Sequence, residues 1–283
     1  MHRLLWIILF LPALSSAQGK INLNLFGGFA NYSGDLQEKR FTIGQSHLAF
    51  GAGVGYAIIP KLQLKLNINY ARISADDKNS SRPLLKERNL NFHTAVVEGN
   101  LLFDYTFLDL ELKRVSPYIF AGAGLYHFNP YSFDSLGLRV DLRPLSTEGQ
   151  GLNNKPYYPL TQLAIPFGGG IRIRITDNTY LAYEIGTRKL FTDHFDDVSG
   201  VYVDQTTLRN ARGQLAVDMA FRGDEVKSNP TSYPPAGTTR GGFKYRDWYY
   251  FSGLTLSIGL MPGDGRLFGG GNKRGRTDCP TGL

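Results

Sequence analysis

The residues of this chain that could do chemistry include four histidines past the first few positions: His47, His93, His127 and His194. Nucleophilic catalysis requires a nucleophile, a base and an acid that orients the base. None of these histidines lies beside a serine and an acidic residue that could complete such a site. The residues around His93 place it on the same strand face as large apolar side chains. We therefore expect histidines at interfaces or in loops, and no enzyme activity.

A cluster of carboxylates offers a second kind of chemistry. Asp193, Asp196 and Asp197 stand in the segment Asp-His-Phe-Asp-Asp and carry enough oxygen atoms for a calcium site. Their spacing does not match an EF-hand loop, so they are candidate ligands only and we expect no metal. The alternative interpretation is an acidic turn tied to the neighbouring strand by Arg188 or Lys189.

Glycine runs at 51–55 and 168–170 could suggest a phosphate-binding loop. Such a loop joins a strand to the N-terminus of a helix and carries a Lys-Ser/Thr pair or an acidic follower. Both runs instead lie inside segments that alternate large and minimal residues. We expect the glycines to relieve crowding inside a barrel, and we expect no cofactor.

The elements that must position all these residues are strands, because apolar side chains recur with period two. In the fourth segment, for example, Val97, Leu101 and Phe103 alternate with Glu98, Asn100 and Asp104, which gives one apolar and one polar face. The segment 118–128 is apolar on both faces, which leaves its orientation ambiguous. Eight such segments are predicted, at 21–32, 48–58, 62–70, 94–105, 118–128, 162–175, 183–188 and 248–260.

The connections between the strands alternate in length. Long ones at 33–46, 75–89, 129–160 and 193–246 alternate with short ones at 59–61, 108–116 and 176–179. Outer-membrane barrels have short periplasmic turns and long extracellular loops, and an even strand number leaves both termini in the periplasm. A soluble barrel would turn its apolar face inward. We therefore predict an all-β fold, an eight-stranded antiparallel transmembrane β-barrel in the outer membrane.

The polar faces assign a set of charges to the barrel lumen. An eight-stranded barrel is only just wide enough for its own side chains, and an unpaired buried charge is very costly. We expect these charges to form a plug of ion pairs rather than a proton or ion path. The predicted lumen network consists of Lys65, Glu98, Asp104, Arg172, Arg174, Glu184 and Arg188.

Composition agrees with an exported, β-rich protein. Glycine makes up 33 of 283 residues, aromatic residues 13% and charged residues 19%, which excludes a disordered chain, and the single cysteine excludes a disulfide scaffold. Residues 1–17 carry a basic start, an apolar stretch and small residues, as in a signal peptide. The expected domains are this signal peptide, the barrel at 18–260 and a flexible, basic periplasmic tail at 261–283, and nucleic acid is not an expected partner.

Several segments, foremost Thr147–Gln150 and Asp196–Gly200, also resemble a family of small Bacteroidota outer-membrane barrels that includes PorG, a component of the type IX secretion system. The most specific are Thr-Glu-Gly-Gln and Asp-Asp-Val-Ser-Gly. Their residues are Thr147, Glu148, Gly149 and Gln150, and Asp196, Asp197, Ser199 and Gly200. Further segments that carry the resemblance are 32–36, 88–92, 117–120, 164–167 and 195–202.

The resemblance implies a non-enzymatic, structural role in protein secretion. Such a barrel would anchor a periplasmic ring of PorK-like and PorN-like subunits beneath the outer membrane, with the outer-membrane lipids as its other partner. The resemblance assigns no catalytic or ligand-binding residue and no small-molecule substrate. Two alternatives stay open: a surface barrel whose long loops bind or adhere to a target, and a membrane-embedded enzyme that modifies lipid.

Overall fold

The computed structural model describes residues 21–37, 43–152, 154–242 and 246–260. The predicted signal peptide and basic tail lie outside these residues. The long strands are β1 (Ile21–Ser33), β2 (His47–Ile59), β3 (Leu62–Asp76), β4 (Asn91–Thr106), β5 (Val115–His127), β8 (Thr161–Arg174), β9 (Thr179–Leu190) and β10 (Trp248–Leu260). The remaining elements are η2 (Ile43–Gln45), η3 (Asp77–Asn79), α2 (Pro83–Arg88), β6 (Tyr131–Phe133), β7 (Arg139–Asp141), η4 (Arg143–Leu145), α3 (Gln205–Arg212), α4 (Gln214–Ala220) and η5 (Gly223–Glu225).

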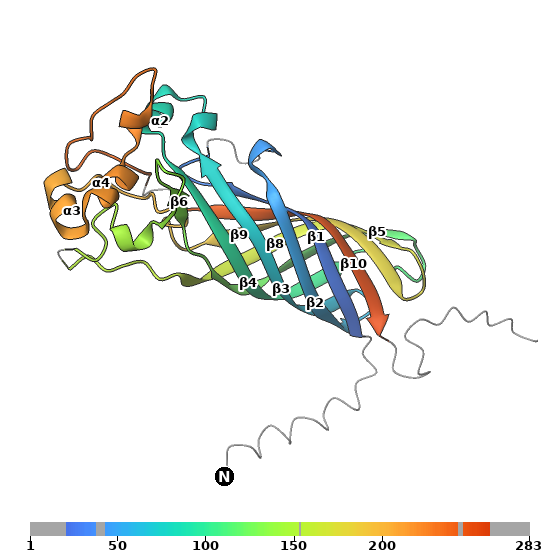
Figure 1. Cartoon of the computed structure of the whole chain (residues 1–283). Coiled ribbons are helices and arrows are strands. Elements are labelled where there is room, and N and C mark those ends of the chain that lie inside the picture. The colour runs from blue at the N-terminus through green and yellow to red at the C-terminus, as the bar shows by residue number, and fades with distance from the viewer. Residues whose placement is uncertain (1–20, 38–42, 153, 243–245, 261–283) are drawn as a thin grey trace, which may run out of the picture.

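The eight long strands close into an antiparallel barrel, which confirms the predicted fold class (Figure 1). Each strand pairs with its neighbour along the chain, β1 pairs with β10, and the pairing of β3 with β4 continues the ring. The short strands β6 and β7 form a hairpin that extends the sheet beside β4. No helix in the described parts of the chain is long and apolar enough to cross a membrane.

The two ends of the barrel differ, and we name them the loop end and the turn end. The loop end carries the four long connections, which form a cap containing α2, α3 and α4 (Figure 1). The turn end carries the three short connections and the first and last described residues, Ile21 and Leu260. The long connection between β9 and β10 contains the helices α3 and α4.

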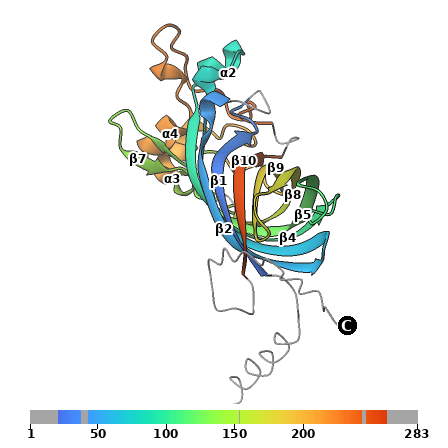
Figure 2. The ribbon, with the colours of Figure 1, turned by 90° about the vertical axis from the view of Figure 1, so that its right-hand side faces the viewer.

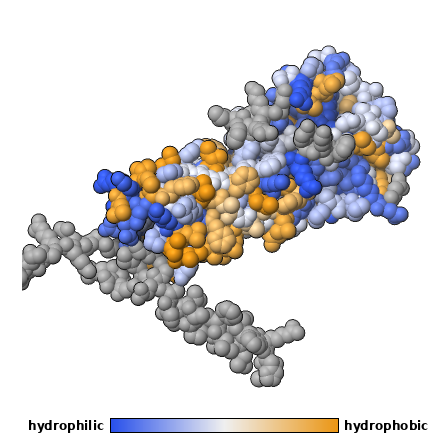
Figure 3. Space-filling view, turned by 180° about the vertical axis from the view of Figure 1, so that it is seen from behind, coloured by the Kyte–Doolittle hydropathy of each residue, from blue (hydrophilic) through white to orange (hydrophobic). Residues whose placement is uncertain are grey.

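Large apolar side chains point outward from the barrel wall. Ile68 is 65% exposed and Phe103 55% exposed, whereas Glu98 and Asp104 on the opposite face are fully buried. The outward side chains form an apolar belt between the polar cap and the polar turn end (Figure 3). Aromatic residues flank this belt, with Tyr105 near the turn end and Tyr70 near the loop end.

Glycine permits the close approach of neighbouring strands and of an inward ring in the lumen. A Cβ atom on Gly168 would lie 2.2 Å from the carbonyl oxygen of Ile185 and 2.7 Å from the ring of Phe120. The glycine therefore leaves room for Phe120, whose ring points inward. The orientation of 118–128 is thereby settled, with Tyr118, Phe120 and Tyr126 facing the lumen.

Candidate functional site

The lumen near the turn end holds a buried carboxylate between two cations. Asp104 on β4 lies 2.6 Å from the Lys65 ammonium of β3 and 2.7 Å from the Arg172 guanidinium of β8. Arg172 also donates to the hydroxyl of Thr106 at 2.7 Å. Three strands are thus tied across the lumen by charge-assisted hydrogen bonds, which are stronger than neutral ones.

A second charged layer lies toward the loop end. Glu98 accepts from the Arg188 guanidinium at 3.1 Å, and from the Tyr249 hydroxyl and the side-chain amides of Asn69 and Asn100. The Arg188 guanidinium also lies 4.1 Å from the ring centre of Phe251. Because Glu98 and Arg188 are both buried, each needs the other to offset the cost of desolvation.

The two other predicted lumen charges lie apart from these layers. Glu184 accepts a hydrogen bond from the Tyr118 hydroxyl inside the barrel. Arg174 lies at the turn end, where its guanidinium is 3.8 Å from Asp177 and its side chain is 26% exposed. The structure therefore places six of the seven residues inside the lumen and Arg174 at its mouth.

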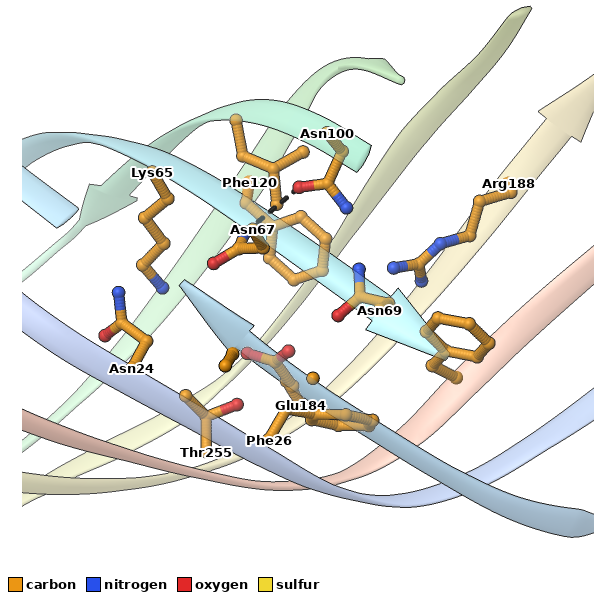
Figure 4. Close-up of a pocket in the computed structure, with 14 residues that line it drawn as sticks. Asn24, Phe26, Lys65, Asn67, Asn69, Asn100, Phe120, Glu184, Arg188 and Thr255 are labelled. Atoms are coloured by element: carbon orange, nitrogen blue, oxygen red, sulfur yellow. Dashed lines mark hydrogen bonds between the residues drawn. The ribbon is translucent and has the colours of Figure 1, made fainter. Parts of the chain in front are cut away.

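A cavity of about 30 Å³ separates the two charged layers, and Figure 4 shows its lining. Side chains of Asn24, Asn67, Asn100 and Thr255 face it, and Asn67 donates to Asn100 at 3.0 Å. Within the described residues, the Asn24 amide nitrogen and the Thr255 hydroxyl have no hydrogen-bond partner. A polar cavity of this size has room for water, and the side chains of the two charged layers fill the lumen on either side of it.

An aromatic plug closes the lumen at the loop end. Phe195, from the long connection between β9 and β10, stacks on Phe128 at 5.2 Å and on Tyr249 at 5.6 Å, measured between ring centres. Tyr32 and Phe92 complete the cluster and are fully buried. The loop segment around Phe195 is therefore part of the barrel core, not a mobile cover.

Glu148 joins two long connections above this plug. Its carboxylate accepts from the backbone amides of Ser199 at 2.9 Å and Gly200 at 3.0 Å. The Arg240 guanidinium donates to the same carboxylate at 3.0 Å and is itself buried. Gln150 in turn accepts from the Glu148 amide at 3.0 Å.

Asp197 links the same two connections a second time. It accepts from the Thr147 hydroxyl and, at 2.7 Å, from the Tyr158 hydroxyl. Burial raises the pKa of Asp197 to about 6, partly opposed by the nearby Arg240. Thr147–Gln150 and Asp196–Gly200, the two segments singled out in the sequence, thus meet in one structure, which we call the loop knot.

Where the loop knot meets the barrel, one tyrosine hydroxyl contacts two carboxyl groups. The Tyr32 hydroxyl lies 2.5 Å from Asp196 and 2.8 Å from Asp247. A phenol has one proton to donate, so one of the two carboxyls must carry a proton of its own for both contacts to be hydrogen bonds. Burial raises the pKa of Asp196 and of Asp247 well above the usual range, and repulsion adds to this effect, from Asp247 on Asp196 and from Asp193 on Asp247.

Arg88 connects the knot to the remaining long loops. It pairs with Asp77 through two hydrogen bonds of 2.7 and 2.8 Å, and it donates to the backbone carbonyls of Arg240 and Asp35. Hydrogen bonds and ion pairs therefore join all four long connections. The sequence did not reveal the partners of Arg88, Arg240 and Asp247, because strand periodicity carries no information on contacts between loops.

The candidate metal ligands have other partners. Asp193 accepts from the Ser199 hydroxyl at 2.9 Å, and burial raises its pKa to about 7. Among the described residues, no three His, Cys, Asp or Glu side chains are grouped so that they could hold a metal ion. The alternative of a tie through Arg188 is wrong, since Arg188 pairs with Glu98, and Asp196 and Asp197 instead accept from hydroxyls of other elements.

The histidines lie at the rim and in the cap. His47 lies 2.6 Å from the Ser74 hydroxyl, His127 lies 2.9 Å from the Thr161 hydroxyl, and His93 stacks on Tyr131. His194 packs against Tyr158, 3.9 Å from the carboxylate of Glu148, and burial lowers its pKa.

Comparison with known proteins gives a family and several similar folds. The family model described as "Domain of unknown function (DUF6089)" matches residues 2–218. No curated protein matches the sequence. Among solved structures, Neisserial surface protein A is similar over 85% of this chain and 97% of its own, with 10% identity and a TM-score of 0.41.

Two further solved structures are similar in the same way. Ail, the attachment invasion locus protein of Yersinia pestis, in complex with a heparin analogue, matches 86% of this chain and 100% of its own, with 8% identity and a TM-score of 0.41. A major outer membrane protein from Thermus thermophilus matches 86% of this chain and 100% of its own, with 13% identity and a TM-score of 0.39.

Proposed function

The chain belongs to the family described as "Domain of unknown function (DUF6089)", and from this premise we propose that it is a non-enzymatic barrel of the outer membrane. The apolar belt supports this location, because side chains such as Leu101 and Leu125, 44% and 57% exposed, would be costly to leave in water. The aromatic residues that flank the belt are typical of the two interfaces of a membrane. The loop end then faces outward and the turn end faces the periplasm.

We further propose that the barrel is a structural, PorG-like component of the type IX secretion system that contacts its periplasmic ring. The observation that carries this proposal is the loop knot. The segments that carry the resemblance, Thr147–Gln150 and Asp196–Gly200, are buried against each other instead of being exposed for a ligand. Contacts between these two segments hold the cap rigid, as expected of a structural component.

The filled lumen also supports a structural role over transport. Its two charged layers and the plug around Phe195 leave a cavity between them of only about 30 Å³. We therefore expect that secreted cargo does not pass through this barrel. Its contribution to secretion lies in anchoring.

The turn end offers the surface for the periplasmic partner. A cavity of about 510 Å³ opens there, lined by the turns between the strands. Its rim carries charges of both signs, including Lys61, Asp109 and Asp177. A partner of the anchored ring would contact these turns.

Crosslinking from the turn end tests the proposal. A photo-reactive residue at Lys61 or Asp177, or at Arg274 outside the described residues, should capture ring subunits in native membranes. The same residue at Leu84 in the cap is the control and should not. Absence of ring subunits, with the barrel folded and abundant, would contradict the secretion role. It would favour the surface-binding alternative, for which deletion of α3 and α4 should abolish target binding while secretion continues.

A further inference from the structure

Two arginines and a tyrosine come together in the cap, where the long connection between β5 and β8 meets α3. Arg143 of η4 and Tyr157 belong to this connection, and Arg212 is the last residue of α3. The guanidinium carbons of Arg143 and Arg212 lie 4.8 and 6.0 Å from the centre of the Tyr157 ring. We call these three residues the arginine site. Figure 2 shows α3 and β7, the strand that leads into η4, on the side of the cap that lies away from α2.

Apolar packing brings the two halves of the arginine site together. Leu145 of η4 packs against the small core of α3 and α4, which includes Leu208 and Val217. This contact holds η4 beside α3. Arg143 and Arg212 therefore reach the same ring, although they belong to two different long connections.

Neutral groups orient both guanidinium groups. Arg212 donates from Nε to the Ser146 hydroxyl at 3.0 Å and from Nη2 to the Tyr157 hydroxyl at 2.6 Å. Arg143 donates from Nε to the backbone carbonyl of Tyr158 at 2.8 Å. Because a guanidinium carries five N–H groups, these bonds leave most donors of both arginines without an acceptor among the described residues.

The arginine site lacks the carboxylate that accompanies other arginines of the cap. Arg88, Arg222 and Arg240 each have a carboxylate oxygen nearby, at 2.7, 2.9 and 3.0 Å. In the part of the chain that the structure describes, neither Arg143 nor Arg212 forms an ion pair. Two cations beside one ring repel each other, and a bound anion would relieve this repulsion.

We propose that the arginine site binds a tetrahedral oxyanion, a phosphate or sulfate group, carried by a polymer outside the cell. Planar guanidinium groups bind such oxygens through paired N–H donors. The Tyr157 ring steadies the cations by cation–π contact and leaves their charge unneutralised. Arg212 is exposed and Tyr157 is half-buried, and an open site of this kind suits a group on a large ligand.

The extracellular position of the ligand rests on the proposed outer-membrane location, whereas the binding chemistry does not. The arginine site lies in the cap, and the proposed contact with the periplasmic ring uses the turn end. The two contacts can therefore exist in one molecule, and each can fail without the other.

Titration calorimetry of the detergent-solubilised full chain tests the site with dextran sulfate, inorganic phosphate and uncharged dextran. Dextran sulfate should bind the wild type and dextran should not. Arg143→Gln and Arg212→Gln should each weaken the binding of dextran sulfate about tenfold or more, because each removes charge-assisted hydrogen bonds.

Arg246→Gln is the matched control. Arg246 is also exposed, donates to the backbone carbonyl of Phe191 at 2.9 Å and lies 6.0 Å from the centre of the Phe191 ring. It stands there without a second arginine on the same ring. Arg246→Gln should therefore bind dextran sulfate as tightly as the wild type.

Tyr157→Phe separates an oriented site from general attraction between charges. This change keeps both cations and removes the hydroxyl that accepts from Arg212, so it should weaken binding severalfold. Unchanged binding by Tyr157→Phe would show that charge alone attracts the polymer, and it would overturn the oriented site. For every variant, the shift in gel mobility on heating confirms that the barrel is folded.

Two further results would overturn the proposal. One is the absence of dextran sulfate binding to the wild type, and the other is equal binding by Arg143→Gln, Arg212→Gln and the wild type. Inorganic phosphate that binds as tightly as dextran sulfate, and is lost in the same variants, would keep the oxyanion site and overturn the polymer as its source. None of these results bears on the crosslinking of ring subunits at the turn end.

Discussion

At the scale of single residues, the lumen charges differ sharply in what they stabilise. Asp104 is enclosed and shared by Lys65 and Arg172, whereas Arg174 pairs with a carboxylate at the open mouth. The penalty for breaking an ion pair depends on whether the abandoned charge can reach water. Two arginines two positions apart in the sequence should therefore respond differently to the same change.

Arg172→Glu should destabilise the folded barrel by about 3–5 kcal/mol, because it removes one partner of buried Asp104 and adds a second carboxylate beside it. Arg174→Glu is the matched control, since its side chain is part-exposed and its partner Asp177 is 96% exposed. We expect a change below about 1 kcal/mol there. Urea unfolding in detergent gives both values, and equal midpoints for the two variants would contradict the assigned burial.

The carboxyl groups that contact Tyr32 predict that the stability of the closed cap decreases as the pH rises. The raised pKa values of Asp196 and Asp247 mean that the closed cap binds more protons than the opened cap. The free energy of opening should therefore fall as the pH rises from about 4, the ordinary carboxyl pKa, toward the raised values. Limited proteolysis of the cap should be slower at pH 5 than at pH 8.

Asp247→Asn should reduce this pH dependence by up to about 1.4 kcal/mol per pH unit, the contribution of one proton. The asparagine oxygen can still accept from the Phe195 amide, which now donates to Asp247 at 3.0 Å, and its amide can donate to Tyr32. Asp218→Asn, on the exposed face of α4, is the control. Identical pH profiles for Asp247→Asn and the wild type would show that no proton is shared there.

At the scale of elements, the strands tolerate a side chain only where the wall has room for it. Gly168 and Gly27 are both glycines inside strands, yet a Cβ on Gly168 meets backbone and ring atoms whereas one on Gly27 meets nothing within 4 Å. Gly27 faces outward and Gly168 faces the crowded lumen. The two positions form a natural pair for a test of strand packing.

Gly168→Val should prevent formation of the closed barrel, because the 2.2 Å approach to the Ile185 carbonyl cannot be relieved without separating β8 from β9. Gly27→Val should fold normally. Folded outer-membrane barrels migrate differently from unfolded ones on unheated gels, so the shift in mobility on heating reports the outcome. A normal shift for Gly168→Val would contradict the packing described for the lumen.

At the scale of the whole molecule, the cap consists of two cores with separate roles. The plug around Phe195 is continuous with the barrel, whereas Leu208, Ala216, Val217 and Ala220 of α3 and α4 form a small core of their own. The first core closes the lumen and the second only shapes the outer surface of the cap.

Phe195→Ala should therefore destabilise the whole molecule by about 3–5 kcal/mol and raise its ion conductance in planar bilayers, since the stacked plug loses its central ring. Replacement of residues 205–217 by a short flexible linker, which keeps Met219 in the first core and the Ala220 carbonyl bonded to Arg240, should leave the conductance unchanged and lower the unfolding midpoint less. Equal effects of the two changes would show that the cap is one cooperative unit.

Side-chain alternation along the sequence predicts the eight strands and, for all of them except β5, which face points outward, and the connection lengths predict the closed barrel. Alternation such as Val97, Glu98 and Gly99 is local, because consecutive side chains of a strand point to opposite faces whatever lies beside them. This alternation did not predict which aromatic residues of β5 point inward. Tyr118 and Tyr126 look apolar like their outward neighbours, but Tyr126 packs against Tyr249 of the plug, and Tyr118 donates to Glu184 and lies against Arg172 deeper in the lumen.

The tertiary structure alone decided which charges pair and how the cap is held. Glu98 meets Arg188, and Tyr32 meets both Asp196 and Asp247, because the stagger of the closed strands and the paths of the loops bring them together. Local periodicity is insensitive to such contacts between residues far apart in the chain. The sequence thus shows which residues belong to the polar network. Which residue pairs with which is determined only when the barrel closes.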